Sequence, residues 1–71
     1  PAEIDDRRRI LESAMAALPQ DQREVLVLKI WSDLTFAQIA DALHIPASTA
    51  ASRYRYAIER LQSLLSLKGV P

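Results

Sequence analysis

Hydroxyl and arginine side chains recur at short intervals between residues 48 and 56, in the run STAASRYRY. These side chains donate hydrogen bonds, and arginine adds a permanent positive charge and a planar fork of donors that suits phosphate. The sequence contains no set of nucleophile, base and orienting group that would support catalysis. The chemistry of this segment is therefore binding, and nucleic acid is the ligand that matches it. We expect neither an enzyme nor a cofactor.

A long helix over residues 47–67 would position these side chains. At 100° per residue its apolar face gathers six residues: Ala50, Tyr54, Ala57, Leu61, Leu64 and Leu65. That face belongs in the core, so the polar residues lie on the sides that remain. Opposite the core line are the candidates for contacts to base edges: Ser48, Ser52 and Arg55. On the flank are the candidates for contacts to the DNA backbone: Thr49, Arg53 and Tyr56.

A second, shorter helix is predicted immediately before it. Thr35 and Gln38 have the spacing of a capping box, so this helix opens at Phe36. It stops at Leu43, because Pro46 disfavours helical backbone at the residue before it. A three-residue corner then joins two helices, which is the outline of a helix-turn-helix. In that arrangement the shorter helix braces across the DNA backbone, and Thr35 and Gln38 join the DNA-binding candidates.

Two earlier helices complete the prediction. The first, over about 4–17, places Ile10, Ala14 and Ala17 on one stripe. The second, over about 19–32, opens at Pro19 and contains the run VLVLKIW, which composition alone would also allow as a buried strand. Its polar, helix-forming start favours a helix. Apolar residues nearly all round predict that it is the most buried helix, with Trp31 packed at least partly inside.

Composition narrows the class of protein. Seventy-one residues with 49% hydrophobic and 25% charged side chains make one small globular domain, near the lower size limit for a self-sufficient core. There is no cysteine and one histidine, so we expect no metal site. No apolar run reaches the length of a membrane span, and the first ten residues are not a signal peptide. We expect no membrane contact and a cytoplasmic location.

Charge is unevenly distributed although the formal net charge is zero. Residues 1–47 hold five basic and eight acidic side chains, whereas residues 48–71 hold four basic and one acidic. The positive part therefore coincides with the proposed reading helix. A solvated helix surface would explain the same arginines without any ligand.

An ordered set of motifs resembles region 4 of bacterial sigma factors, closest to the extracytoplasmic-function (ECF) group. The similar stretch covers residues 18–61: LPQDQREVLVLKIWSDLTFAQIADALHIPASTAASRYRYAIERL. The resemblance implies a four-helix domain that reads the −35 promoter element with its last helix and contacts the β flap of RNA polymerase with its earlier helices. It also implies an upstream region 2 domain that this chain lacks, in keeping with a start at Pro1 instead of methionine.

Three positions depart from the pattern of that family, and one of them is Ala50, which fills less of the core than the usual valine. His44 stands at the corner where glycine is usual, and histidine tolerates the left-handed backbone that a corner needs. Ala51 stands where the family commonly has a lysine that contacts DNA. These departures bear on DNA binding more than on the fold.

We therefore predict an all-α, compact four-helix domain containing a helix-turn-helix. Residues 1–17 would be the end of a linker and the first helix, and residues 18–71 the helix-turn-helix region, within one domain overall. The predicted function is recognition of double-stranded promoter DNA for transcription initiation. The alternative is an interaction module with a degenerate reading helix that binds the polymerase flap or an anti-sigma factor. A LuxR-type DNA reader is a further alternative, although the ending RYAIERL fits sigma factors better.

Overall fold

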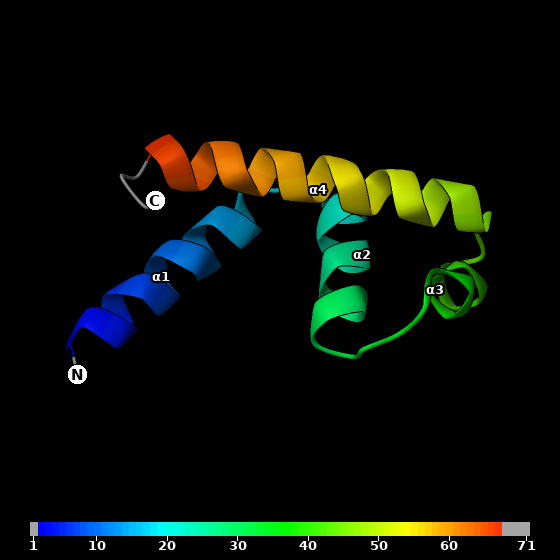
Figure 1. Cartoon of the computed structure of the whole chain (residues 1–71), viewed down its shortest axis with the longest axis horizontal. Coiled ribbons are helices and arrows are strands. Elements are labelled where there is room, and N and C mark those ends of the chain that lie inside the picture. Colours follow the sequence, from blue (N-terminus) through cyan, green and yellow to red (C-terminus); the bar gives the residue numbers. More distant parts are fainter. Residues whose placement is uncertain (1, 68–71) are drawn as a thin grey trace.

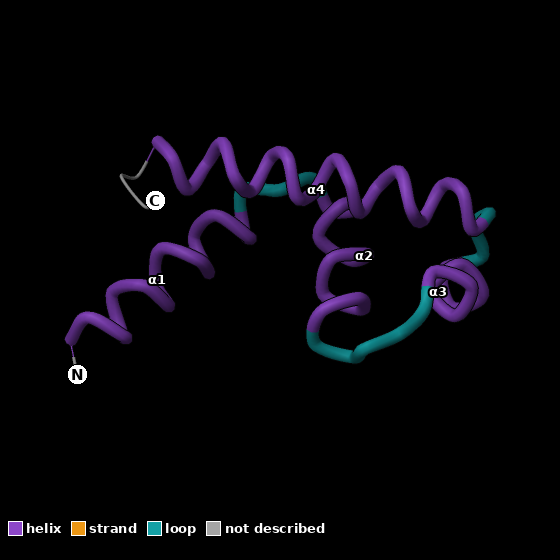
Figure 2. The backbone as a smooth tube through the Cα atoms, viewed as in Figure 1, coloured by secondary structure: helices purple, strands orange, loops and turns teal. Residues whose placement is uncertain are grey.

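The longest helix, α4 (Ala47–Leu67), contacts each of the other three helices. The computed structural model describes residues 2–67, with the side chains of residues 6–66, so Pro1 and the last four residues of the predicted domain lie outside the described residues. Along the chain, α4 follows α1 (Ala2–Ala16), α2 (Gln20–Ile30) and α3 (Phe36–Leu43). These three helices contact successive stretches of α4, from its C-terminal end to its start (Figures 1 and 2). The predicted all-α class is confirmed over this range, where there are four helices and no strand.

Two hydrophobic clusters hold the helices on α4. Beneath its C-terminal half, a buried group joins α1, α2 and α4: Met15, Leu18, Leu26 and Ala57. Beneath its start, a second buried group joins α2, α3 and α4: Val25, Ile39 and Ala50. Tyr54 packs against both clusters. The predicted core face of α4 is confirmed, since Ala50 and Ala57 are fully buried and the rest of that face is partly buried.

The boundaries of α3 are those that the sequence predicted. Thr35 Oγ1 accepts from the Gln38 backbone N–H at 3.1 Å, and Gln38 Oε1 accepts from the Thr35 N–H at 2.8 Å, so the capping box is complete. The helix ends at Leu43, and His44 has the left-handed backbone expected of the corner, with φ 57° and ψ 46°. The N–H of Ile45 then donates to the Ala40 carbonyl at 3.0 Å, which satisfies a carbonyl at the helix end.

The predicted ends of the first two helices need small corrections. α1 begins before Ile4 and ends at Ala16, and Ala17 is exposed instead of lying on the buried stripe. The reason is a turn in which the Leu18 N–H donates to the Met15 carbonyl, so Met15 and Leu18 face the core while Ala17 turns outward. Pro19 precedes α2 as its N-cap residue with extended ψ of 146°, and α2 ends at Ile30 instead of residue 32.

Burial of α2 is one-sided, whereas the sequence predicted a central helix with apolar contacts nearly all round and a Trp31 packed at least partly inside. Only one side of α2 faces the core, through Val25 and Leu26. Its opposite side leaves Val27 38%, Ile30 49% and Trp31 59% exposed. The reason is that α1 packs on α4 and diverges from α2 (Figure 1), so no described helix covers that side. An apolar run indicates that burial of the helix is favourable, but it does not indicate how many other helices pack against it.

Candidate nucleic-acid interface

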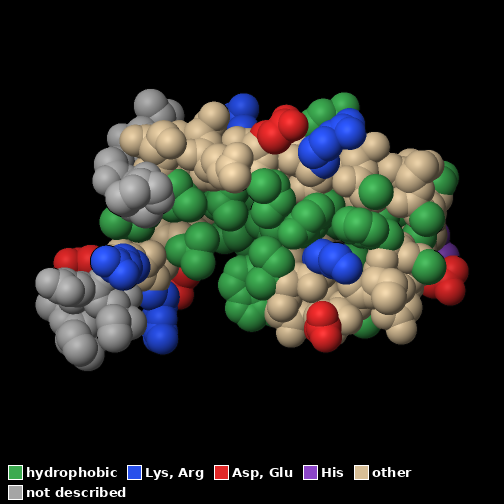
Figure 3. All heavy atoms as spheres, in the orientation of Figure 1, with side chains coloured by type: hydrophobic (Ala, Val, Ile, Leu, Met, Phe, Trp, Pro, Cys, Tyr) green, Lys and Arg blue, Asp and Glu red, His purple; other side chains and the backbone are tan. Residues whose placement is uncertain are grey.

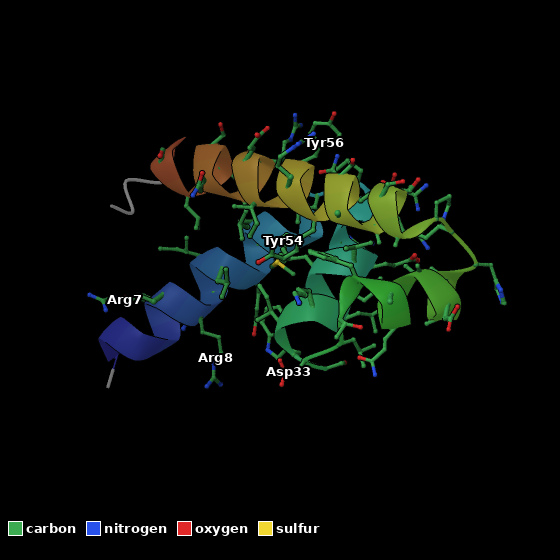
Figure 4. All side chains as sticks on the ribbon, turned by 45° about the vertical axis from the view of Figure 1, so that its right-hand side comes forward. Arg7, Arg8, Asp33, Tyr54 and Tyr56 are labelled. Atoms are coloured by element: carbon green, nitrogen blue, oxygen red, sulfur yellow. The ribbon has the colours of Figure 1, made fainter. Side chains whose placement is uncertain are left out.

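The first three turns of α4 carry six of the eight predicted binding residues, on its outward face and its flanks. Ala50 and Tyr54 turn toward the body, where the Tyr54 ring meets Phe36 of α3 edge-on, with 5.5 Å between the ring centroids. This contact fixes how α3 sits against α4. Figure 4 shows Tyr54 pointing into the body and Tyr56 pointing away from it. Because the apolar side of α4 packs in the core, its polar side faces outward.

The exposed part of this face holds Ser48, Arg55 and Tyr56. The Arg55 guanidinium lies over the Tyr56 ring, 5.2 Å from its centroid, in a cation–π contact. Ser52 and Thr49 are half-buried toward the side of the helix. The arrangement offers hydroxyl and guanidinium donors along a convex helix surface, which is the shape that enters a major groove.

Arg53, a predicted backbone-contact residue, points sideways toward α2. Its Nε lies 3.6 Å from Oδ2 of Asp21, and the side chains are 32% and 53% exposed, respectively. The other carboxylate oxygen of Asp21 accepts from the Gln22 backbone N–H at 3.0 Å. The sequence did not predict this pairing, because the two residues lie far apart in the chain and no local pattern connects them.

The exposed side chains of Thr35 and Gln38 lie at the start of α3, away from the polar run of α4 in sequence but joined to it by the helix-turn-helix. Each already uses an oxygen in the capping box. A threonine hydroxyl and a glutamine amide keep further donors, so the cap does not exhaust their hydrogen-bonding capacity. Six of the eight predicted residues thus lie on α4, and the other two lie at the start of α3, where Phe36 contacts Tyr54 of α4.

Two residues that orient the helix-turn-helix were also missed. Lys29 of α2 donates from Nζ to the Leu34 carbonyl at 3.3 Å and lies 4.7 Å from the centroid of the Phe36 ring. Asp33, in the same connection, has a left-handed φ of 54°. An aspartate tolerates that region better than most residues do, and this tolerance was the signal available in the sequence. Together these residues set the path from α2 into α3.

A separate surface lies between α1 and α2. A groove there has an apolar floor formed by Leu11, Met15, Val27 and Trp31. Its margins carry charged side chains: Arg7, Arg8, Arg23 and Glu12. Figure 3 shows the hollow beside α1, with hydrophobic side chains on its opposite wall, and Figure 4 shows Arg7 and Arg8 extending from α1. Arg23 also donates to the Ala16 carbonyl at 3.2 Å and so ties α2 to the end of α1.

Within residues 2–67, no group of three or more His, Asp or Glu side chains is arranged to hold a metal ion. No helix in that same range combines the length and apolar character needed to cross a bilayer. The fold and the polar face of α4 together define a helix-turn-helix protein of the nucleic-acid-binding class.

Comparison with known proteins narrows that class. The family model described as "Sigma-70, region 4" matches residues 8–61, so the chain belongs to this family. Over 64 residues the chain is 36% identical to the ECF RNA polymerase sigma factor SigK of Mycolicibacterium vanbaalenii, and 33% identical to the ECF RNA polymerase sigma factor RpoE of Cereibacter sphaeroides. These matches cover 90% of this chain but only 33% and 35% of those relatives. The chain thus spans about a third of the length of the curated relatives that it matches.

The resemblance to region 4 of ECF-type sigma factors is confirmed by these matches. They also set aside the LuxR-type alternative. Because the matched region runs from residue 8, it takes in most of α1 as well as the helix-turn-helix.

Proposed function

We propose that this chain is the promoter-recognition domain of an ECF-type sigma factor, which reads the −35 element during transcription initiation in the bacterial cytoplasm. The observation that carries the proposal is the outward face of α4, where hydroxyl and guanidinium donors stand on a helix whose apolar side is fixed in the core. The role is binding, without a chemical step on the DNA.

In this proposal α4 lies in the major groove and α3 crosses the backbone. The contacts to base edges come from Ser48, Ser52 and Arg55. The contacts to phosphates come from Thr49, Arg53 and Tyr56, with Thr35 and Gln38 at the start of α3. Phosphate contacts would supply most of the affinity and its salt dependence, and base contacts most of the preference.

The groove between α1 and α2 supports the second half of the proposal, a contact with the β flap of RNA polymerase. Three exposed apolar residues lie on or next to the α2 side of the groove: Val27, Ile30 and Trp31. Exposed apolar patches often mark binding sites for partner proteins, and tryptophan is enriched among the residues that contribute most to such binding. The groove lies on the side of the molecule that α1 and α2 form, away from the start of α4. One domain could therefore hold DNA and polymerase together.

A titration of labelled duplexes tests the DNA half. We expect the chain to bind a duplex carrying its −35 element more tightly than a scrambled duplex, with an affinity that falls as salt rises. Binding without sequence preference would contradict the promoter-reading role. The duplex should be selected from a random library, so that the preferred sequence is found and not assumed.

The same groove favours the second candidate function, an interaction module that binds the flap or an anti-sigma factor and reads no DNA. The two candidates separate in one experiment. If the selected library shows no enrichment and no shift at low salt, while Trp31→Ala abolishes capture of the isolated flap domain, the interaction module becomes the better account.

A further inference from the structure

The pair formed by Asp21 and Arg53 places an acidic side chain beside a proposed phosphate contact. Arg53 leaves the flank of α4 toward the first turn of α2, where its Nε lies 3.6 Å from Oδ2 of Asp21. On electrostatic grounds alone, an aspartate at this position should repel DNA. The first turn of α2 suits a negative charge in any case, so the feature to be explained is the contact of this aspartate with Arg53.

The carboxylate of Asp21 is itself held in place. Its Oδ1 accepts from the Gln22 backbone N–H at 3.0 Å, within the first turn of α2, where the helix dipole favours negative charge. α2 is in turn fixed to α4 through Leu26 and Ala57. Asp21 is thus a charged group attached to a rigid element, and it acts on a side chain of the neighbouring helix.

In this ion pair the Nε side of the Arg53 guanidinium is the part near Asp21, at a distance longer than a hydrogen bond. A guanidinium has five N–H donors, and four of them are on the two terminal nitrogens. Arginine otherwise loses considerable rotamer freedom when it binds a ligand. An arginine that an ion pair already biases toward one orientation loses less of that freedom when DNA binds.

We propose that Asp21 is a positioning residue for DNA binding, which holds Arg53 so that its terminal nitrogens face a phosphate. This inference rests on the proposed function. The pair is expected to contribute little to the stability of the fold, because ion pairs with this exposure are weak. Its effect lies in the geometry of one arginine.

The sign of the effect tests the proposal. Asp21→Asn removes a negative charge and keeps the size of the side chain, so simple charge repulsion predicts tighter DNA binding. Positioning predicts the reverse, a loss of about 2- to 10-fold, which corresponds to ordering one flexible side chain at the interface. Asp21→Glu keeps the carboxylate and should retain most of the affinity. The matched control is Glu24→Gln, which removes the same charge from the same helix at a residue paired only with Gln20 in the described structure.

The measurement is a duplex titration of the 71-residue chain, with circular dichroism to confirm that each variant keeps its helix content. Asp21→Asn should weaken binding relative to Glu24→Gln in the parent chain, and should not weaken it when Arg53 is already alanine. A purely structural role for Asp21 would lower affinity equally in both backgrounds and would overturn the proposal. Equal or tighter binding by Asp21→Asn would overturn it as well. Absence of salt-dependent DNA binding by the parent chain would instead overturn the proposed function.

Discussion

Arg55 and Tyr56 show how the reading face is ordered at the scale of single residues. The guanidinium lies over the ring, 5.2 Å from its centroid, although both side chains are exposed. A cation–π contact at an exposed site contributes about 0.5–1 kcal/mol, enough to bias the arginine toward one orientation. A planar, oriented guanidinium suits bidentate contact with a base edge.

Replacement of Arg55 tests that role. Arg55→Ala should relax the preference at one base position, at a cost of about 1–3 kcal/mol for that base pair if the contact is bidentate. Binding to unrelated duplexes should change less. The measurement is a set of titrations with singly substituted duplexes, and Arg9→Ala on α1 is the control for loss of the same charge. Uniform weakening on every duplex would instead assign Arg55 to the phosphate backbone.

Ala51 offers the opposite test, the gain of a contact. It is half-buried on the side of α4, so a lysine there can extend its stem along the helix and place its ammonium in solvent. Ala51→Lys should strengthen DNA binding and steepen the salt dependence by about 0.9 in the logarithmic slope, the value for one further phosphate contact. Ala17→Lys adds the same charge at an exposed position before α2. If the two variants behave alike, α4 does not lie in the groove as proposed.

At the scale of the elements, the corner between α3 and α4 carries backbone strain. His44 has φ 57° and ψ 46°, a region that costs most residues with a Cβ atom roughly 1–2 kcal/mol. The corner nonetheless closes, because the N–H groups of His44 and Ile45 both donate to the Ala40 carbonyl. A substitution that removes the strain at His44 and keeps these two hydrogen bonds should stabilise the corner.

His44→Gly should therefore stabilise the domain. Glycine removes the crowding of the Cβ atom, but its greater conformational entropy in the unfolded chain lowers stability by about 0.4–1 kcal/mol. The expected net gain is about 0.5–1 kcal/mol, a rise in melting temperature of about 2–8 °C for a domain of this size. Thermal melts followed by circular dichroism provide the measurement. His44→Val should lower the melting temperature, since a β-branched residue is poorly tolerated at positive φ.

The two sides of α2 should respond differently to truncation. Leu26 is fully buried, so Leu26→Ala should cost about 2–5 kcal/mol, much of the stability of a small domain. Trp31 is 59% exposed, so Trp31→Ala should change stability by no more than about 0.5–1 kcal/mol. Urea titrations of the two variants measure both values. A large loss on truncation of Trp31 would show that its ring is covered in solution.

At the scale of the whole molecule, one long helix connects two small cores. The described chain extends 39 × 22 × 17 Å, and its cores lie in succession along α4 instead of forming one centre. Tyr54 is the side chain that packs against both of them. This shared contact favours unfolding of the domain as one cooperative unit.

The cooperativity can be tested at Tyr54. The unfolding transitions followed by Trp31 fluorescence and by circular dichroism should coincide in the parent chain. Tyr54→Ala should lower stability by about 2–4 kcal/mol, somewhat less than the loss of a fully enclosed ring. Tyr54→Phe keeps the ring and serves as the control. Two separated transitions in the parent chain would mean that the cores unfold independently.

The features that could be predicted from the amino-acid sequence are those that depend on residues close together in the chain. The capping box of Thr35 and Gln38, the end of α3 and the left-handed corner at His44 follow from local hydrogen bonds and backbone preferences. The core face of α4 follows from helical periodicity over 21 residues. The ordered motifs were sufficient to identify the family, and the matched region confirms it. The eight DNA-binding residues remain predictions.

Which surfaces are covered and which distant residues are in contact became known from the packing of the helices. The run VLVLKIW has the same composition whether α1 lies against it or away from it, so the exposed side of α2 and the groove beside it could not be read from the pattern. The pairing of Asp21 with Arg53 depends on the packing of α2 across α4. The hydrophobic effect is non-directional, so it does not specify which apolar side chains stay exposed. That depends on how the helices pack.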